Sequence, residues 1–348
     1  MKKLPELNLQ IDSLFDIANG HTKSQLLLAA IELKVFDHLS TPQSAESVAD
    51  QLDTHPEYTR FLLDGLTALN LLFKKDGCYH NCPDTQVTLH SQSPAYLGKM
   101  FSMMDQMSSS IMADIGQRLR SGPSDEPVDL GNEAIWAAHA RSMANYQRSG
   151  AAQQMATRIA QIEGFESFEK MLDLGGGPGL YCLAMVAEHP NMRGVIFDQP
   201  AVTQVAEEFI AEYEMADRVT TMGGDYLNDP IGEGYDLIWA SATLNFARDG
   251  LDAMIEKIHH ALKPGGVFVS HADGLTQERT QPAAYVLGSM AWMFSGQDIM
   301  FNSGEIAGAM KRAGFVSVES STVETPMMPM ELDLARNKGL TSRQDIHI

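Results

Sequence analysis

The chain of 348 residues is long enough for one large or two medium domains, and its 44% hydrophobic content is ordinary for a globular protein with a sizeable core. Its formal net charge of −20 at pH 7 argues against nucleic-acid binding, because phosphates require a basic surface. No apolar run approaches the roughly 18 residues of a membrane span, and no apolar signal segment follows the first residues, so we expect a cytoplasmic protein without a membrane partner.

The first 95 residues predict three helices followed by a hairpin, which is the order of a winged-helix module. The helices are expected over 13–39, 44–52 and 56–72, and the hairpin over 73–89. Ser44 and Thr54 are the expected helix caps, and Asp76-Gly77 is the expected hairpin turn. Winged helices often bind DNA, but residues 1–95 hold 7 Lys and Arg against 12 Asp and Glu, a net charge of 7 − 12 = −5. A DNA-binding surface is therefore not expected.

The three cysteines do not form a disulfide framework. Cys78 and Cys82 flank His80, so a metal site is conceivable there. A closed zinc site needs a fourth ligand, however, and these are more simply small residues of a hairpin. We expect no metal.

Two long helices are expected in the middle of the chain. The first, over 96–119, carries Met residues at helical spacing, which either pack in a core or line a pocket. The segment 121–129 is rich in Pro, Ser and acidic residues and predicts a surface loop. The second helix is expected over 135–162 and leads into the last domain.

From residue 163 onward, short apolar strands alternate with helices. The strands are expected near 170–174, 194–198, 219–222, 235–240, 266–271 and 315–323. This alternation predicts an α/β domain with a parallel sheet and right-handed crossovers.

The first of these strands runs into the sequence Met-Leu-Asp-Leu-Gly-Gly-Gly-Pro-Gly at 171–179, after which the apolar spacing becomes helical. Gly175, Gly177 and Gly179 allow positive φ and let a ligand approach without meeting a Cβ. The helix that follows offers free N–H groups at its N-terminus. A strand, a glycine turn and a helix in this order begin a nucleotide-binding crossover.

The spacing of the glycines distinguishes between the possible ligands of this turn. A pyrophosphate-binding turn usually has the pattern G-x-G-x-x-G, whereas this turn has G-x-G-x-G and is preceded by Asp173. Asp198 ends the next strand, 198 − 177 = 21 residues after Gly177, where an acidic residue suits a ribose diol. Asp225 follows the third strand and suits an adenine amine. The pattern predicts a site for an adenosine ligand without phosphates.

Four motifs together resemble the class I S-adenosylmethionine-dependent methyltransferases. They are Asp-Leu-Gly-Gly-Gly-Pro-Gly at 173–179, Phe-Asp-Gln-Pro at 197–200, Gly-Gly-Asp at 223–225 and Leu-Lys-Pro-Gly-Gly at 262–266. More narrowly, the chain is similar to the dimeric small-molecule O-methyltransferases, which include plant caffeate enzymes and bacterial natural-product enzymes, over roughly 14–321. The resemblance implies a homodimer, S-adenosylmethionine as cofactor, a mostly α winged-helix dimerisation domain over 1–95, a helical linker contributing to the substrate pocket over 96–162, and a Rossmann-like catalytic domain over 163–348.

The resemblance also implies site residues. The implied cofactor-binding residues are Asp173, Gly175, Gly177, Asp198, Gln199, Gly224, Asp225, Tyr226 and Ser241. The implied substrate residues are Met143, Arg148, Met290, Trp292, Met293 and Phe294. The last four lie on an expected helix over 282–301, which equally fits a packed core, and whose aromatic residues could shelter a sulfonium by cation–π contact.

The catalytic base is the point at which this chain departs from the family. In the plant enzymes a His after the fourth strand is the base, supported by two Glu residues. By hand alignment Asn245 stands in place of that His, and His271 and Met300 stand in place of the Glu residues. Either His271, His139 or Tyr146 is the base, or no base is needed because a thioether or neutral amine attacks directly, while Asn245 orients the acceptor.

Two further functions stay open on the sequence. One is an S-methyltransferase acting on a thiol or thioether such as a methylthio hydroxy acid, whose carboxylate would need a cation such as Arg141, Arg148 or Arg279. The other is a non-catalytic, cofactor-binding regulator with a winged-helix module. The sequence does not identify the methyl acceptor.

Overall fold

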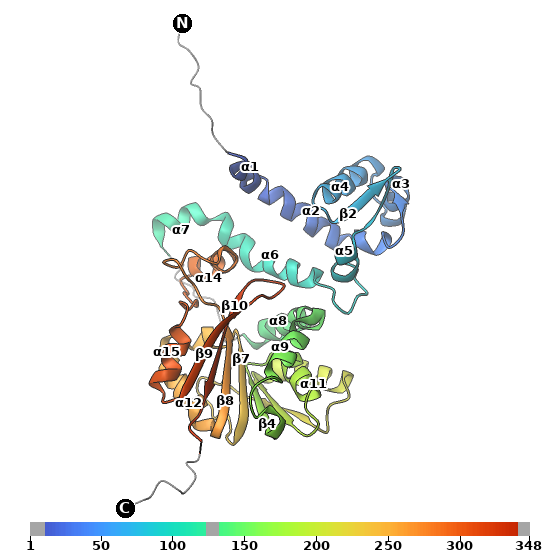
Figure 1. Ribbon diagram of the computed structural model, residues 1–348. Coiled ribbons are helices and arrows are strands. Elements are labelled where there is room, and N and C mark those ends of the chain that lie inside the picture. Colours follow the sequence, from blue (N-terminus) through green and yellow to red (C-terminus); the bar gives the residue numbers. More distant parts are fainter. Residues whose placement is uncertain (1–10, 123–131, 340–348) are drawn as a thin grey trace, which may run out of the picture. The chain divides into compact units, whose positions relative to one another are not determined.

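The computed structural model describes residues 11–122 and 132–339. The chain divides into two compact units between Ser102 and Met103. The segment 96–162, which we predicted as a separate linker, is therefore shared between these units. The loop expected over 121–129 lies almost entirely outside the described residues. Figure 1 shows the elements of both units, and each unit is described by itself.

The N-terminal unit consists of helices and a small antiparallel sheet in the order β1-β3-β2. Its elements are α1 (Asp12–Ala18), α2 (Gly20–Glu32), β1 (Gln43–Ser44), α3 (Ala45–Leu52), α4 (Pro56–Ala68), β2 (Leu72–Lys75), β3 (Cys78–Asn81) and α5 (Pro83–Thr88). Residues 13–39 do not form one helix, because α1 ends before Asn19 and Lys34 turns left-handed with φ 55°. The core is apolar and includes Val35, Phe36 and Leu63.

The ends of these elements test the expected caps and turn. The Ser44 hydroxyl accepts a hydrogen bond from the Ser47 N–H at 3.2 Å, so Ser44 caps α3 as predicted. Thr54 does not cap α4, whose N-cap is His55 without a side-chain bond. Asp76 and Gly77 both have positive φ, 51° and 79°, as a two-residue hairpin turn requires. The hairpin ends at Asn81 rather than near residue 89.

The second unit is built on a seven-stranded sheet in the order β6-β5-β4-β7-β8-β10-β9. The strands are β4 (Lys170–Leu174), β5 (Arg193–Asp198), β6 (Val219–Gly223), β7 (Tyr235–Ser241), β8 (Leu262–Ala272), β9 (Ser317–Val323) and β10 (Met330–Arg336). The first five are parallel. The predicted parallel pairing is confirmed for these five strands, and the unpredicted β10 inserts antiparallel between β8 and β9.

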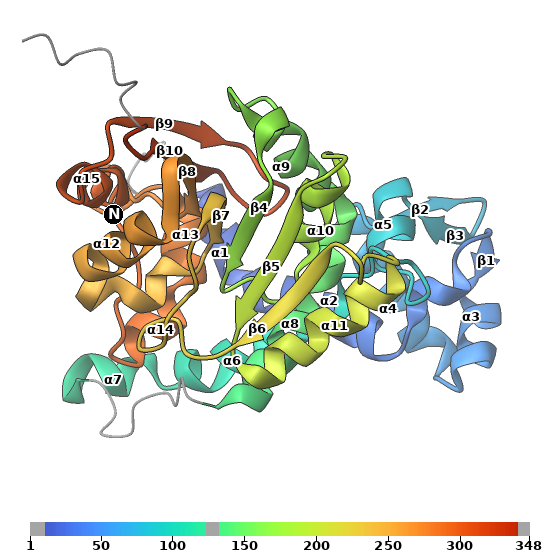
Figure 2. The ribbon, with the colours of Figure 1, turned by 90° about the horizontal axis from the view of Figure 1, so that it is seen from below.

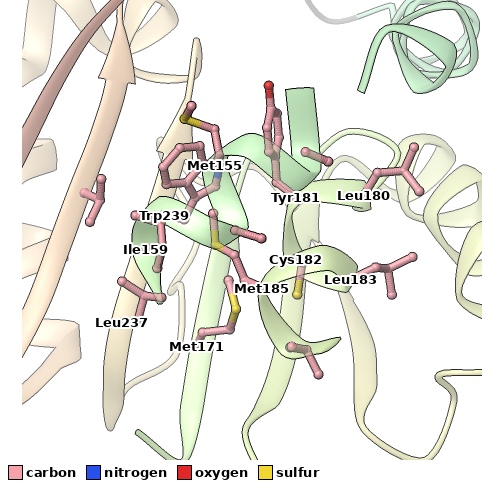
Figure 3. Packing of buried hydrophobic residues seen from close by; sticks show 14 of the residues in the cluster. Met155, Ile159, Met171, Leu180, Tyr181, Cys182, Leu183, Met185, Leu237 and Trp239 are labelled. Carbon is pink, nitrogen blue, oxygen red and sulfur yellow. The ribbon is translucent and has the colours of Figure 1, made fainter. Parts of the chain in front are cut away.

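Helices cover both faces of this sheet (Figures 1 and 2). One face packs against α9 (Ala152–Ile159), α10 (Leu180–Ala187) and α11 (Pro200–Glu212), and the other against α12 (Leu251–Ala261) and α15 (Glu305–Arg312). Figure 3 shows the first of these layers, in which Met155, Met185 and Trp239 pack together. Each strand face is apolar because a doubly wound sheet is buried on both sides. The α/β, Rossmann-like prediction is confirmed.

Three expected long helices are interrupted. The segment 135–162 forms α8 (Glu133–Tyr146) and α9, with an irregular turn at 147–151 in which Gly150 has φ 117°. The segment 96–119 forms α6 (Gly98–Ala113) and α7 (Ile115–Ser121), and the segment 282–301 forms only the short helices α13 (Ala283–Gly288) and α14 (Met290–Phe294). Within residues 11–122 and 132–339, no helix has the length and apolar character to cross a membrane, and no three side chains of His, Cys, Asp or Glu gather to hold a metal ion.

Candidate active site

The glycine turn after β4 is held in a conformation that requires glycine. Gly175, Gly177 and Gly179 have φ of 63°, 57° and 76°, which L side chains rarely adopt. A Cβ on Gly175 would lie 2.5 Å from Cγ2 of Thr243, and one on Gly179 would lie 2.3 Å from Cδ1 of Ile196. A Cβ on Gly177 would meet nothing within 4 Å. Two of the glycines are thus needed for packing, and Gly177 leaves the backbone accessible to a ligand.

Asp198, at the end of β5, is fixed against this turn. Its Oδ2 accepts a hydrogen bond from the Gly177 N–H at 2.8 Å, and its Oδ1 accepts one from the Gln199 N–H at 2.8 Å. Burial raises the pKa of Asp198, and these two backbone bonds oppose that rise. Each oxygen keeps a further lone pair, so the carboxylate can accept bonds from two hydroxyl groups of a ligand.

Asp173 lies beneath the turn. Its side chain is 1% exposed and accepts a hydrogen bond from the Cys182 N–H at 3.2 Å. Burial raises the pKa of Asp173 to about 7, and the neighbouring Asp198 adds to the rise. A Cβ on Gly176 would lie 2.8 Å from Cγ of Asp173, so this carboxyl group supports the turn from below.

The ends of β6 and β7 complete the same edge of the sheet. The Gly224 N–H donates to the Asp198 carbonyl at 3.0 Å, and the Tyr226 hydroxyl donates to the Thr243 carbonyl at 3.1 Å. Asp225 is exposed and accepts bonds from the Leu227 N–H and the Asn228 amide at 2.9 and 2.6 Å. The structure therefore brings the predicted cofactor residues together at the carboxyl ends of β4, β5, β6 and β7.

His271 is fully enclosed next to Ser241. Cross-strand pairing places the two residues opposite each other, and His271 Nδ1 lies 2.9 Å from Ser241 Oγ. The imidazole is 1% exposed and stacks on Trp239 with the ring centroids 5.4 Å apart. Burial lowers the pKa of His271 to about 4, and no carboxylate among the described residues forms an ion pair with it. A neutral imidazole in this environment is a weak general base, because its protonated form would be a buried, unpaired charge.

Asn245 is linked to a residue that the sequence analysis missed. Its Nδ2 donates to Asp273 Oδ1 at 2.5 Å and to the Ile299 carbonyl at 2.8 Å. Asp273 follows β8 and is 3% exposed, and its Oδ2 accepts from the Phe301 N–H at 2.7 Å. The signal was available, because Asp273 comes two residues after the end of an expected strand whose carboxyl end lies at the active edge of the sheet.

Three other candidates for proton transfer are shielded from water. Burial raises the pKa values of the Tyr146 and Tyr285 phenols, and the negative charge of Asp273 raises that of Tyr285 further. Burial lowers the pKa of His139. Among the described residues, the Tyr285 hydroxyl and His139 Nδ1 are buried without a hydrogen-bond partner.

Aromatic side chains of α8 and α14 contact Phe246, the residue that follows Asn245. The adjacent Phe246 meets Trp136 and Trp292 edge to face, with centroids 5.0 and 6.4 Å apart, and Trp136 meets His139 at 5.7 Å. The other predicted substrate residues, Met143, Met290, Met293 and Phe294, are half-buried. Trp292 is the one that a ring contact places beside Phe246.

The structure does not bring Arg148 to this cluster. Its guanidinium lies over the rings of Phe209 and Tyr213 on α11, 4.8 and 5.6 Å from their centroids, and pairs with Glu212 at 2.5 Å. Arg141 pairs with Glu208, and Arg279 pairs with Asp298 at 2.7 Å. All three cations that we considered for a substrate carboxylate are thus already paired with acidic side chains.

The fold and the residues at this sheet edge define a doubly wound α/β protein with a nucleoside-binding turn. Residues 133–316 match the O-methyltransferase domain family, and residues 15–91 match the O-methyltransferase dimerisation domain. The first match spans 316 − 133 + 1 = 184 of the 348 residues, more than half of the chain. The chain belongs to the O-methyltransferase family, whose members transfer a methyl group from S-adenosylmethionine to small molecules.

Individual relatives agree with this assignment. The chain is 26% identical over 310 residues to the tetracenomycin polyketide synthesis 8-O-methyl transferase TcmO of Streptomyces glaucescens, covering 87% of this chain and 91% of that one. It is 29% identical over 289 residues to the N,N-dimethyltransferase OxyT of Streptomyces rimosus, covering 80% and 82%. In fold it is similar to human N-acetylserotonin methyltransferase, solved in complex with SAM, with a TM-score of 0.78 and 24% identity over 96% of this chain and 100% of that one. The predicted family and the predicted enzyme class are confirmed, which removes the non-catalytic regulator.

Proposed function

We propose that this methyltransferase holds S-adenosylmethionine at the carboxyl ends of β4, β5, β6 and β7. The observation that carries the proposal is the Asp198 carboxylate, which accepts bonds from the N–H groups of Gln199 and of Gly177, the glycine whose Cβ position is open. In that position Asp198 binds the ribose diol, and Asp225, after β6, accepts from the adenine amine. Ser241 ends β7, and Thr243 Oγ1 lies within 3.2 and 3.5 Å of the Ser241 and Gly175 carbonyls, so we assign Ser241 to the amino-acid end of the cofactor.

When bound, S-adenosylmethionine supplies an activated methyl group, so the protein has to align the acceptor rather than build a reactive group. Asn245 and Phe246 follow β7, and Trp292 contacts Phe246. We assign these three residues to the acceptor. The two relatives described above carry names that specify oxygen and nitrogen as the methylated atom. Family membership therefore leaves the acceptor atom of this chain to be decided by its own residues.

The Asp198→Ala variant tests the cofactor site. Removing the carboxylate should weaken binding of S-adenosylhomocysteine by roughly 1.5–3 kcal/mol, the range for a hydrogen bond to a charged group, or about 10- to 150-fold in Kd. Asp217→Ala, which removes an exposed carboxylate from the same unit, is the matched control and should bind as the wild type does. Isothermal titration calorimetry measures both. Equal affinity in the Asp198→Ala variant and the wild type would refute the assignment.

We also propose that the chain forms a homodimer through its N-terminal unit. The match to the dimerisation domain supports this, as does α1, which buries no residue and leaves Leu14, Phe15 and Ile17 63%, 63% and 74% exposed. Light scattering should give twice the 38.2 kDa of one chain, and Ile17→Glu should shift the mass toward one chain. Val316→Glu changes an apolar residue of the second unit that is 60% exposed and should leave the mass unchanged. A wild-type protein with the mass of a single chain would contradict the proposal. The cytoplasmic location stays a prediction.

A further inference from the structure

We propose that the acceptor atom is a neutral amine nitrogen or thioether sulfur, which becomes positively charged on methylation, and that the buried Asp273 stabilises this charge through Asn245. The inference rests on the proposed function and narrows its substrate class. Asp273 is a positioning residue here, since Asn245 lies between it and the acceptor.

The first argument is that Asn245 and the residues bonded to it offer no suitable acceptor for a proton, and that His139, which meets Trp136, is a weak base because burial lowers its pKa. A hydroxyl nucleophile has to lose its proton, whereas an amine or thioether attacks with a free lone pair. Asn245 has no basic atom, and Asp273 is buried behind it, bonded to Asn245 Nδ2 and the Phe301 N–H. The Tyr146 and Tyr285 phenols stay protonated because burial raises their pKa values. His271 is enclosed between Trp239 and Tyr181 with its Nδ1 on Ser241.

The second argument is the unbalanced charge of Asp273. The side chain is 3% exposed, and among the described residues no Lys, Arg or His nitrogen lies within 4.0 Å of its oxygens. Burial raises the pKa of Asp273, and the bonds from Asn245 and the Phe301 N–H oppose that rise. Arg248 acts on Asp273 from a longer distance, but that guanidinium donates to the Met300 carbonyl and pairs with Glu305 at 3.6 Å. A buried carboxylate without a paired cation is costly, so a cation that forms nearby is stabilised by it.

The third argument is the orientation of the Asn245 amide. Its Nδ2 faces two acceptors, Asp273 Oδ1 and the Ile299 carbonyl, which fixes the amide group in one of its two possible orientations. Its Oδ1 is therefore the free end, and it is buried without a partner among the described residues. A carbonyl oxygen presents negative charge to a developing cation or accepts from an amine N–H. The rings of Phe246, which follows Asn245 in the chain, and of Trp292, which contacts Phe246, are available for cation–π stabilisation.

The transfer balances without a proton acceptor in the protein. The acceptor nitrogen or sulfur uses its lone pair to form a bond to the methyl carbon. The bond between that carbon and the sulfonium sulfur breaks, and its electron pair stays on the departing sulfur. The positive charge moves to the acceptor, and a product amine that bears N–H releases its proton to water after it leaves.

The first experiment uses three acceptors that share a phenyl ring and differ in the nucleophile, namely phenol, N-methylaniline and thioanisole. The full chain is incubated with labelled S-adenosylmethionine at pH 7.5, at which all three are neutral. We expect methylation of N-methylaniline or thioanisole at a rate at least tenfold above that of phenol, and the faster of the two identifies nitrogen or sulfur. Faster methylation of phenol than of both others would overturn the proposal.

The second experiment measures charge preference by binding and is independent of turnover. With S-adenosylhomocysteine present, phenyltrimethylammonium should bind the wild type at least tenfold more tightly than its neutral isostere tert-butylbenzene. Asp273→Asn should lose this preference while its affinity for S-adenosylhomocysteine stays the same. The matched control is Asp333→Asn, which neutralises another buried carboxylate of the same unit, 1% exposed, and should keep the preference.

Equal affinity of the wild type for the two probes would overturn the proposal whatever the turnover assay shows, and this comparison does not depend on any variant folding. The cofactor site is tested separately. Failure of Asp198→Ala to weaken S-adenosylhomocysteine binding counts against the proposed function, whereas normal cofactor binding without a preference for the cation counts against this inference alone.

Discussion

Replacing Gly175 by Ala should be the most damaging single-methyl change in the catalytic unit. The residue has φ 63°, and its new Cβ would lie 2.5 Å from Cγ2 and 2.7 Å from Oγ1 of Thr243. A non-glycine residue held in this region costs about 1–3 kcal/mol, and overpacking a well-filled site costs about 1–3 kcal/mol more. Because the Thr243 hydroxyl donates to the Leu174 carbonyl at 2.8 Å, the side chain cannot move away without losing that bond. We expect the melting temperature to fall by roughly 5–15 °C.

Gly177→Ala is the matched control for this prediction. Its φ of 57° imposes similar backbone strain, but a Cβ there would meet nothing within 4 Å. Differential scanning calorimetry should therefore show a much smaller loss of stability than for Gly175→Ala. Titration with S-adenosylhomocysteine should nevertheless show weaker binding, because the added methyl group occupies the face that we assign to the cofactor. Equal melting temperatures for the two variants would contradict the packing role of Gly175.

His271 should make the stability of the enzyme depend on pH, and with a definite sign. Burial lowers its pKa in the folded protein to about 4, from an ordinary value of 6.5. Between pH 4 and pH 6.5 the unfolded chain binds this proton more readily than the folded protein does. The stability contributed by neutral His271 is therefore fully present above pH 6.5, and the free energy of unfolding decreases as the pH falls toward 4. From pH 7.5 to pH 5 the loss should be about 2 kcal/mol. In urea unfolding, the free energy of unfolding of His271→Gln should decrease between these two pH values by about 2 kcal/mol less than that of the wild type.

Comparison with a control variant isolates the effect of His271 on the pH dependence of stability. Burial raises the pKa values of Asp173 and Asp333 to about 7 and about 6, which changes stability in the opposite direction, but these groups are present in both proteins and cancel in the difference. His260→Gln replaces an exposed histidine of α12 and should keep the wild-type pH dependence. A pH dependence in His271→Gln that equals the wild type would show that His271 is not buried neutral.

The same variant distinguishes positioning from base catalysis. If His271 only holds Ser241, His271→Gln should keep activity within about tenfold between pH 7 and 9, since geometry alone changes. If it is the base, the variant should lose a factor on the order of 10²–10⁴, and the wild-type rate should show an ionisation in the histidine range. The second outcome would also remove the main argument for a cation-forming acceptor.

The parts of the site that the sequence predicted are those set by local backbone chemistry. Gly175, Gly177 and Gly179 have to be glycine because the turn needs positive φ within five residues of chain, and the strand before it and the helix after it have their own periodicity. Asp198 was predictable for the same reason, since it ends an apolar strand whose neighbour in the sheet follows from a right-handed crossover. Neither inference needed the identity of a distant contact.

The pairings of polar side chains were not predictable in this way. Asp273 reaches Asn245 across 28 residues, and His271 faces Ser241 only because β7 and β8 pair in one register. Arg148 contacts Phe209 and pairs with Glu212 on α11 instead of lying at the acceptor residues. The periodicity of the sequence does not predict which neighbour a long cationic side chain contacts. The antiparallel strand β10 was not predicted, although Met330, Leu332 and Leu334 alternate with Glu331 and Asp333 as in a strand.

The sequence by itself therefore determined the doubly wound fold, the glycine turn and the adenosine-type ligand, because each of these follows from the residue types and spacings of short segments. Only the tertiary structure showed how deeply the candidate bases are buried and which partners they have. The availability of a base depends on burial and on these partners. Burial lowers the pKa of His271, and the hydrogen-bond partner of Asp273 is the neutral amide of Asn245 instead of a cation. Solvent exclusion and strand register are properties of the packed molecule, and the same residues at the same spacing would titrate differently in another packing.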